Sequence, residues 1–344
     1  MKIVYQLPAD RPDGLYHCLA VARELFFLGH GVEVWSRGDL SRAVEWMYPQ
    51  GYEVPVRRGV YTGQADWLHL GMFPGAFEDA PATLGRVRLA MDVEMLPLGT
   101  SPRDYDPSLR RLSARLALSR FTAERLIDVL GLSSHVVGQG VDFSLLEEDQ
   151  PTARTRTEPF LLTVVGAGRE GGRNDLLAAL ARLPGAPGLV IVSPKETEGC
   201  LAAAKRLGVA QRVEWMADAP RRALVHLYRN AALFVLPSHY EGFGLPALEA
   251  MAAGVPVVLT DCGGVWEFAR PDHNCRMVPA GRPELLALAI GHLLADAYER
   301  RRLSDNGVSD ARAFTWRRVA EATLKGLSFV MEESQGVPAT LSAP

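Results

Sequence analysis

The sequence predicts an α/β protein with two domains, each built on a doubly wound parallel sheet. The chain has 344 residues, which is enough for two domains of ordinary size. Short apolar runs alternate with helical patterns in both halves, as they do when helices join the parallel strands of a sheet. A polar stretch containing proline, residues 147–159, separates the two series and is the expected linker.

The first domain, residues 1–146, opens with a strand over residues 2–7, a loop that contains Gly14, and a helix over residues 15–28. A glycine-rich turn leads from this helix into a second strand. Strand, glycine-containing loop, helix and strand are the usual opening of a doubly wound sheet. The expected strands that follow are residues 32–35, 67–70, 87–91, 116–119 and 135–138.

The second domain, residues 160–315, repeats the same alternation after the linker. Its expected strands are residues 160–165, 189–193, 212–215 and 233–236, and its expected helices are residues 175–182, 196–207 and 222–230.

The composition excludes several classes of protein. Apolar residues make up 48% and charged residues 22%, as in globular rather than disordered chains. The net charge of −3 gives no reason to expect a nucleic-acid partner. No signal peptide and no membrane-spanning stretch is recognisable, so we expect a cytoplasmic protein. The four cysteines lack metal-ligand spacing and are expected to be buried free thiols: Cys18, Cys200, Cys262 and Cys275.

The most informative stretch is residues 237–264. It places two carboxylates, Glu241 and Glu249, eight positions apart, with a glycine-rich turn between them. Pro246 suits the first turn of a helix, which Gly254 and Pro256 then end. A strand, a tight turn and a helix N-terminus form an anion site, because backbone N–H groups point outward there. If these groups hold a diphosphate, the carboxylates can accept hydrogen bonds from hydroxyls on either side, which describes a nucleotide sugar. The alternative is two ordinary carboxylates flanking a helix.

The order of residues in this stretch also resembles a known signature. The positions that carry the resemblance are Ser238, Glu241, Gly242, Phe243, Gly244, Leu245, Pro246, Glu249, Ala250, Gly254 to Val258, Gly263, Gly264 and Glu267. They closely resemble the donor-binding signature of family 4 retaining glycosyltransferases with the GT-B fold. The resemblance implies that Glu241 contacts the donor sugar and Glu249 accepts from the ribose hydroxyls. Four further landmarks extend it over most of the chain: FLGHGVEVW, ADWLHL, LALSRFTAERL and GQGVD.

For the fold, the resemblance implies two Rossmann-like domains that face each other across a cleft. A late helix, residues 316–332, is expected to cross back onto the first domain, and the tail, residues 333–344, to be disordered. For the donor, the turn and the helix N-terminus are expected to present the backbone N–H groups of Gly242, Phe243, Gly244 and Leu245 to the phosphates.

The diphosphate also needs cations, because its charges are costly to desolvate without partners. The loop VVGAGREGGRND follows the first strand of the second domain. Where the family usually carries an arginine and a lysine, this chain has Ala167 and Gly172. Arg169 and Arg173 are the nearest substitutes, and a solvated surface loop is the alternative. Because no Asp-x-Asp pair stands in a donor-site context, donor binding without a metal or other cofactor is expected.

In the first domain, the family usually has two adjacent glycines near the donor phosphates. Only Gly14 is present, with Asp13 beside it, so Gly14 alone is assigned to the donor site; a turn glycine without ligand contact is the alternative. Many members also have a histidine in the fourth strand, where this chain has Met91. Asp92 is the candidate for a polar group that faces the sugar or the acceptor hydroxyl, and a strand-end cap is the alternative reading.

Other polar residues are assigned structural roles or left open. His69 is expected to be a structural histidine, His239 could contact the donor edge, and Glu267 is expected to pack or cap. A basic stretch could meet an anionic membrane surface, a glycolipid or an acidic acceptor, or could be a solvated face: Arg110, Arg111, Arg115, Arg120 and Arg125.

These observations predict an enzyme that moves a sugar from a nucleoside diphosphate to an acceptor hydroxyl with retention of anomeric configuration. The leaving diphosphate would take the acceptor proton, so no enzyme nucleophile is required. Alternatives are a nucleotide-sugar epimerase, an inverting transferase, and a degenerate transferase that serves as a binding subunit. The nucleotide base, the sugar, the acceptor and the oligomeric state stay open.

Overall fold

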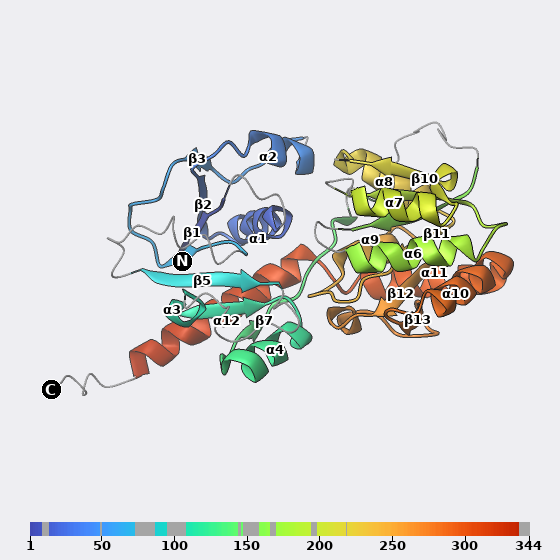
Figure 1. Cartoon of the computed structure of the whole chain (residues 1–344). Helices are drawn as coiled ribbons and strands as arrows, with labels where there is room; N and C mark the ends of the chain where they lie inside the picture. The colour runs from blue at the N-terminus through green and yellow to red at the C-terminus, as the bar shows by residue number, and fades with distance from the viewer. Residues whose placement is uncertain are drawn as a thin grey trace. The chain divides into compact units, whose positions relative to one another are not determined.

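The structure, a computed structural model, divides into two compact units (Figure 1). One unit comprises Met1–Gly140 with Trp316–Pro344, and the other comprises Val141–Thr315. The unit boundary at Gly140 lies six residues before the predicted domain end at residue 146. The structure describes residues 1–8, 14–48, 50–72, 87–94, 108–143, 146, 158–165, 170–193, 198–217 and 219–336. Most of the predicted linker, residues 147–159, lies outside these ranges.

The first unit contains a seven-stranded parallel sheet with the order β3-β2-β1-β4-β5-β6-β7. Its strands are β1 Lys2–Gln6, β2 Gly31–Ser36, β3 Val56–Arg58, β4 Trp67–His69, β5 Arg88–Val93, β6 Ala114–Ala117 and β7 His135–Val136. The strand order reverses between β1 and β4. In open α/β sheets, ligands bind at the carboxyl ends of the strands next to such a reversal.

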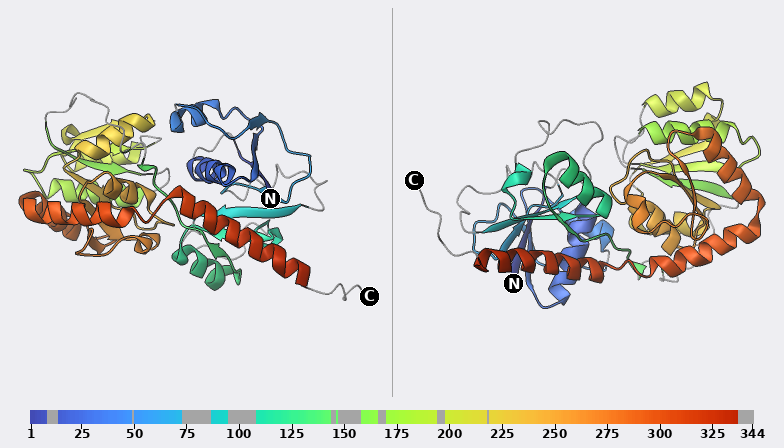
Figure 2. Two further views of the ribbon diagram at one scale, coloured as in Figure 1. Left: turned by 180° about the vertical axis from the view of Figure 1, so that it is seen from behind. Right: turned by 90° about the horizontal axis from the view of Figure 1, so that it is seen from below.

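The described helices of the first unit are α1 Leu15–Phe27, α2 Ser41–Met47, α3 Ser108–Arg111, α4 Arg120–Leu130 and α12 Trp316–Gly336. Helix α12 comes from the far end of the chain and packs on α1, β6 and β7 (Figure 2). The approach to the sheet is close, since a Cβ atom on Gly326 would lie 3.0 Å from Cβ of His135. The helix continues to Gly336, beyond the predicted end at residue 332.

The second unit contains a six-stranded parallel sheet with the order β10-β9-β8-β11-β12-β13. Its strands are β8 Phe160–Val164, β9 Gly188–Val192, β10 Val213–Met216, β11 Leu233–Leu236, β12 Val257–Asp261 and β13 Arg276–Pro279. The order reverses between β8 and β11, which places the switch point of this sheet where β11 runs into the motif stretch.

The helices described in the second unit are α6 Glu170–Ala181, α7 Glu198–Arg206, α8 Arg221–Asn230, α9 Leu245–Ala252, α10 Pro283–Ala295 and α11 Ala297–Ala311, with 3-10 turns at Ala210–Arg212 and Gly264–Glu267. Two helices begin earlier than predicted. Helix α6 starts five residues before residue 175, so Gly172 and Arg173 belong to a helix and not to a loop. Helix α8 starts at Arg221, one residue before the prediction.

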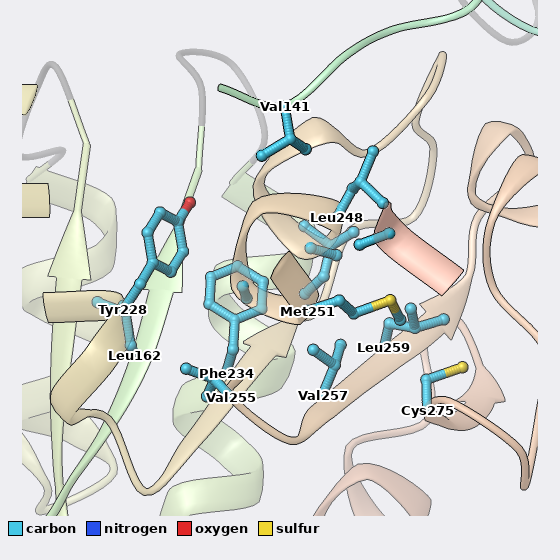
Figure 3. Close-up of a cluster of buried hydrophobic side chains, with 14 of the residues drawn as sticks. Val141, Leu162, Tyr228, Phe234, Leu248, Met251, Val255, Val257, Leu259 and Cys275 are labelled. Carbon is cyan, nitrogen blue, oxygen red and sulfur yellow. The ribbon is translucent and has the colours of Figure 1, made fainter. Parts of the chain in front are cut away.

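Apolar packing fixes α9 against the sheet (Figure 3). Leu248 and Met251 of α9 belong to the same buried cluster as Phe234 of β11 and Val257 of β12. Full burial of each such side chain contributes about 1.5–3 kcal/mol. This packing holds the N-terminus of α9 at the carboxyl edge of the sheet, directly after the glycine-containing turn.

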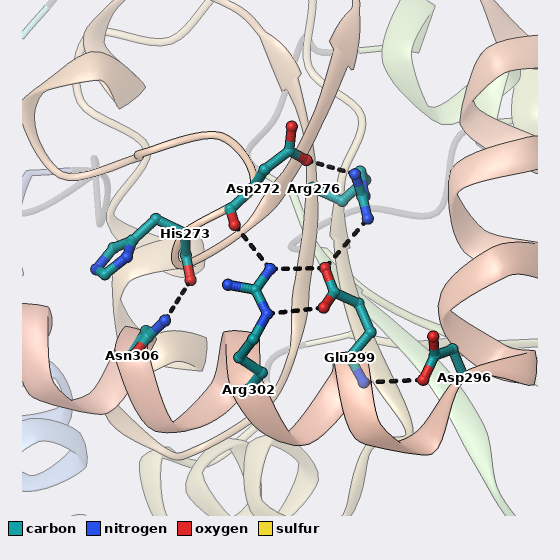
Figure 4. Close-up of polar contacts among 7 residues, drawn as sticks. All are labelled: Asp272, His273, Arg276, Asp296, Glu299, Arg302 and Asn306. Atoms are coloured by element: carbon teal, nitrogen blue, oxygen red, sulfur yellow. Dashed lines mark hydrogen bonds and ion pairs between the residues drawn. The ribbon is translucent and has the colours of Figure 1, made fainter.

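A polar network holds α11 beside β13 (Figure 4). Glu299 accepts from Arg302 at 2.8 Å and from Arg276 at 3.2 Å. Arg302 also donates to the backbone carbonyl of Asp272 at 2.7 Å, and Arg276 pairs with the Asp272 carboxylate. Because partly exposed ion pairs contribute little energy one by one, the network chiefly fixes the orientation of the helix.

Candidate functional site

The candidate site lies at the carboxyl ends of β8 and β11 in the second unit. The segment after β11 carries Ser238 to Gly244 and leads into α9. The segment after β8, residues 166–169, lies outside the described residues, and Arg169 with it. A hollow of about 380 Å³ lined by Glu158, Gly188 and Arg212 lies at the amino ends of the strands, so it belongs to the opposite edge of the sheet.

Two glycine-containing segments meet backbone to backbone and fix Glu241. The Glu241 N–H donates to the Cys262 carbonyl at 2.7 Å, and the Gly264 N–H donates to the Glu241 carbonyl at 2.8 Å. A Cβ atom on Gly264 would lie 2.0 Å from the Gly242 carbonyl oxygen, which leaves no room for any side chain. Gly244, with φ +90°, then turns the chain into α9.

The Glu241 side chain is 2% exposed and accepts a hydrogen bond from the Ser238 hydroxyl at 2.6 Å. His239 lies two residues before it in the sequence. Its Nε2 atom lies 2.6 Å from Asp175 Oδ2 on α6, where the ring is about half exposed. His239 therefore links the motif segment to α6.

Glu249 lies inside α9 and is 5% exposed. Arg221 Nη2 lies 2.6 Å from its Oε1 atom, and the Tyr228 hydroxyl donates to Oε2 at 3.2 Å. Both partners come from α8. Sequence reasoning missed them, although their spacing of seven residues places them on one helix face.

Backbone N–H groups at the start of α9 are available to a ligand. Within the described parts of the chain, the N–H groups of Phe243, Gly244 and Leu245 have no hydrogen-bond acceptor. The Phe243 ring is 2% exposed and packs against Phe268 at a centroid distance of 5.5 Å, so only its backbone can contribute to binding. The helix dipole adds to the preference for an anion at this end.

The N-terminus of α6 reaches the same edge of the sheet. A Cβ atom on Gly172 would lie 2.3 Å from the Pro237 carbonyl oxygen, so the lysine that the family usually has at this position would not fit. The next residue is an arginine. Arg173 is 1% exposed, its Nη1 donates to the Ser193 hydroxyl at 3.2 Å, and its guanidinium lies 5.7 Å from the Trp215 ring centroid. A cation in the first turn of a helix adds to the positive potential there, which favours an anionic ligand.

The predicted residues of the first unit gather at the reversal of its own sheet. Gly14, with φ +84°, caps the start of α1 and packs against Met72. This environment is what the alternative, a turn glycine without ligand contact, predicts. Asp92 of β5 is 1% exposed, and its Oδ2 atom lies 3.3 Å from Nε2 of both His17 and His69. Burial by itself would raise the pKa of Asp92, but the imidazoles of His69 and His17 hold it well below its usual range.

Cys18, His69 and Asp92 have the composition of a metal site, and their ligand atoms lie within 4.8 Å of one another. The hydrogen bond that His69 accepts opposes that reading. The Gly71 N–H points at His69 Nδ1 at 3.2 Å, which places the ring proton on Nε2, toward Asp92. A metal ligand needs the Nε2 lone pair and normally donates through its other nitrogen. Burial also raises the pKa of the Cys18 thiol well above its usual value, so it is not a ready thiolate.

The basic stretch of the first unit is largely used within the protein. Arg110 donates to the Leu130 carbonyl at 2.9 Å, and Arg115 donates to the carbonyls of Ser133, Leu109 and Leu112. These two side chains therefore close the ends of local segments.

Comparison with known proteins identifies the family. Residues 146–310 match the family described as Glycosyl transferases group 1. A D-inositol 3-phosphate glycosyltransferase from Xylanimonas cellulosilytica is 31% identical over 314 residues, which cover 84% of this chain and 73% of the relative. The chain belongs to the glycosyl transferases group 1 family. An MMP alpha-(1->4)-mannosyltransferase from Mycolicibacterium hassiacum is 33% identical to this glycosyltransferase over 227 residues, which cover 62% of the chain and 54% of the relative.

Solved structures agree with the fold of this glycosyltransferase. HepE from Anabaena in complex with UDP and glucose has a TM-score of 0.79 at 20% identity, over 96% of this chain and 100% of that one. The likeness confirms the predicted GT-B fold class with two Rossmann-like domains. None of the helices in the described part of this glycosyltransferase has the length and hydropathy needed to cross a bilayer.

Proposed function

We propose that this glycosyltransferase moves a sugar from a nucleoside diphosphate to an acceptor hydroxyl with retention of anomeric configuration. One observation carries the proposal: two buried carboxylates, Glu241 and Glu249, flank a turn whose backbone N–H groups are open to an anion. The similarity to a D-inositol 3-phosphate glycosyltransferase supports a sugar donor, as does that to HepE, whose structure was solved in complex with UDP and glucose.

In this proposal the N–H groups of Gly244 and Leu245 meet the diphosphate, and Arg173 adds positive charge. Glu249 accepts hydrogen bonds from the ribose, and Glu241 accepts them from the sugar. No metal takes part, so activity should persist in the presence of EDTA. Arg169 and Gly14 are also proposed to contact the donor phosphates.

The transfer itself is proposed as a front-face substitution. The acceptor oxygen forms a bond to the anomeric carbon while the bond from that carbon to the diphosphate oxygen breaks, and the acceptor proton passes to the leaving diphosphate. The protein places the reactants and stabilises the departing charge, so no enzyme nucleophile is needed. Contact of Asp92 with the sugar or acceptor stays part of the proposal.

The acceptor is proposed to be a hydroxyl compound, and D-inositol 3-phosphate is the first to test because a relative of 31% identity bears its name. A peripheral contact with a membrane surface is a further proposal. It rests on the grouping of five arginines within residues 110–125 of the sequence.

The experiment adds UDP-glucose, GDP-mannose or ADP-glucose to the full chain, with and without D-inositol 3-phosphate, and measures release of nucleoside diphosphate. Proton NMR of the product then reports the anomeric configuration. Release with an α-linked product from an α-linked donor supports the proposal. A β-linked product indicates an inverting enzyme, and an isomerised sugar nucleotide without transfer indicates an epimerase. Nucleotide binding without turnover for every donor tested would favour the degenerate binding subunit.

A further inference from the structure

The carboxylate of Glu249 is held more firmly than hydrogen bonding to a ribose alone requires. Both of its oxygens already accept from side chains of α8, Oε1 from Arg221 at 2.6 Å and Oε2 from Tyr228 at 3.2 Å. The two donors lie seven residues apart, about two helical turns, so one face of α8 delivers both. The plane of the carboxylate is therefore set by the packing of α8 against α9.

These contacts leave a defined part of the carboxylate available. A carboxylate has about four acceptor sites, two on each oxygen. In the described part of the chain, side chains fill one site on each oxygen, so each oxygen keeps one site for a ligand. The Glu249 side chain retains 6% exposure and is not fully closed off.

The charge of Arg221 decides what kind of ligand suits those two sites. An isolated carboxylate in a buried place would attract a cation or take up a proton. Because Arg221, itself 4% exposed, already balances the charge, the carboxylate can accept from neutral hydroxyls instead. Two open sites on two neighbouring oxygens match two neighbouring hydroxyl groups.

We propose that Arg221 and Tyr228 are positioning residues that set Glu249 to bind a vicinal diol, so that the site selects ribonucleotide donors over 2′-deoxyribonucleotide donors. The inference rests on the proposed function, since it specifies the ribose role of Glu249. It assigns the donor class to sugars on UDP, GDP or ADP and excludes sugars on dTDP. Loss of one hydroxyl leaves one acceptor site of this mostly buried carboxylate unfilled, which weakens binding by about tenfold or more.

The experiment measures binding to the full chain by calorimetry, using UDP, GDP and ADP and the 2′-deoxy form of each. We expect the ribonucleotide that binds best to bind at least about tenfold more tightly than its own 2′-deoxy form. In Tyr228→Phe and Arg221→Lys, the carboxylate loses a fixed donor, and this ratio should fall toward one. Tyr228→Phe changes only a hydroxyl, and Arg221→Lys keeps the positive charge.

Matched controls separate positioning from folding. Arg222→Lys changes the exposed neighbour of Arg221 on the same helix, and Tyr298→Phe changes a tyrosine that is 78% exposed; both should keep the wild-type ratio. Thermal unfolding confirms that each variant is folded. A positioning role moves the ratio of the two affinities, whereas a purely structural role lowers both affinities together.

The outcomes distinguish this inference from the proposed function. Equal affinity of the wild type for a ribonucleotide and its 2′-deoxy form overturns the inference and leaves the proposed function standing. An unchanged ratio in folded Tyr228→Phe and Arg221→Lys overturns the positioning roles. If no nucleoside diphosphate binds at all, the proposed function fails, and the inference fails with it.

Discussion

Three buried carboxylates in the described part of this chain each have a different kind of polar partner. Glu241 accepts from the neutral Ser238 hydroxyl, Glu249 pairs with the Arg221 guanidinium, and Asp92 faces two imidazoles. Burial of a charge without such partners costs several kcal/mol. Since the partners differ, substitution of each carboxylate should produce a different pattern of effects.

Glu241 accepts from the neutral Ser238 hydroxyl, and its substitution by glutamine tests whether it contacts a ligand. In Glu241→Gln the side chain keeps its size and one oxygen for Ser238. If Glu241 contacts the sugar, the turnover number should fall at least about 100-fold while affinity for the bare nucleoside diphosphate stays within about threefold. Steady-state kinetics and calorimetry measure the two quantities. A parallel loss of both would place Glu241 on the nucleotide.

Asp92 should make stability depend on pH. Its folded pKa lies below the unfolded value of about 3.9, so its contribution is fully present above that value and is lost as the pH falls below it. Asp92→Asn should therefore be less stable than the wild type at neutral pH, by about 1–3 kcal/mol. The difference should shrink below about pH 4, as measured by urea unfolding at several pH values.

The control for this pH dependence is Asp305→Asn, which changes a carboxylate that is 71% exposed. It should leave stability unchanged over the same range. A constant difference between wild type and Asp92→Asn at every pH would contradict the charge argument. If Asp92→Asn is as stable as the wild type but transfers sugar more slowly, this result supports a contact of Asp92 with the sugar or the acceptor hydroxyl.

Part of the candidate site could be predicted from local sequence patterns. The rest could not, because it depends on contacts between residues far apart in the sequence. Glu241 and Glu249 are recognisable because turn and helix signals place them within one short segment. Arg221 becomes relevant only through the packing of α8 on α9, a contact across 28 residues that no local pattern encodes. The place of Arg173 depends on the same kind of contact, since Gly172 lies against Pro237.

Among secondary-structure elements, strands were easier to predict than short connecting elements. The central strands are continuous apolar runs, as buried parallel strands are. By contrast, α2 has seven residues without a side-chain cap, and β3 has three residues that are all exposed, so neither has a periodic apolar pattern. Helix α6 begins with the poor helix formers Gly171 and Gly172, and its packing against the motif segment overrides their low propensity.

Gly264 tests the backbone contact that holds the motif segment. In Gly264→Ala the new methyl group would overlap the Gly242 carbonyl oxygen, which lies 2.0 Å from the ideal Cβ position. The segments must separate, so we expect a loss of stability of at least about 1–3 kcal/mol and a strong loss of nucleotide affinity. Urea unfolding and calorimetry measure these effects. Gly185→Ala is the control, because nothing lies within 4 Å of its Cβ position.

The start of α6 carries a second prediction at this scale. If Arg173 meets the diphosphate, Arg173→Gln should weaken UDP binding by about 1.5–3 kcal/mol and leave binding of uridine almost unchanged, because only UDP carries the charge. Calorimetry with both ligands measures the difference. Equal effects on UDP and uridine would show that Arg173 supports the segment through Ser193 and Trp215 and does not bind phosphate.

At the scale of the whole molecule, the order of segments in the sequence does not tell which of the two units a segment belongs to. The chain leaves the first unit after Gly140 and returns to it at Trp316. The returning helix buries Trp316, Val319 and Leu327, each at most 6% exposed. Burial of three such side chains approaches the stability of a typical domain, about 5–15 kcal/mol. Local patterns predict that α12 is a helix, but only tertiary packing decides which unit it completes.

Truncation of the chain after Thr315 should therefore destabilise the first unit, although the deleted residues adjoin the second in sequence. The deletion removes the contacts of α12 with α1, β6 and β7, including the hydrogen bond from Trp67 Nε1 to Met331 Sδ at 3.4 Å. Hydrogen exchange should show loss of protection in α1 and β6, while α9 and β11 stay protected. Because the proposed ribose contacts and every proposed diphosphate contact except that of Gly14 come from the second unit, nucleotide binding should persist while sugar transfer is lost.

A chain truncated after Gly336 supplies the control, since it keeps the whole of α12 and should behave like the wild type. Equal loss of protection in both sheets after truncation at Thr315 would contradict the division, because it would mean that the two units unfold as one. Loss of protection in α9 and β11 alone would assign α12 to the second unit. The result depends on which apolar surface α12 covers, and the burial of Leu327 against the first unit predicts which sheet loses its protection.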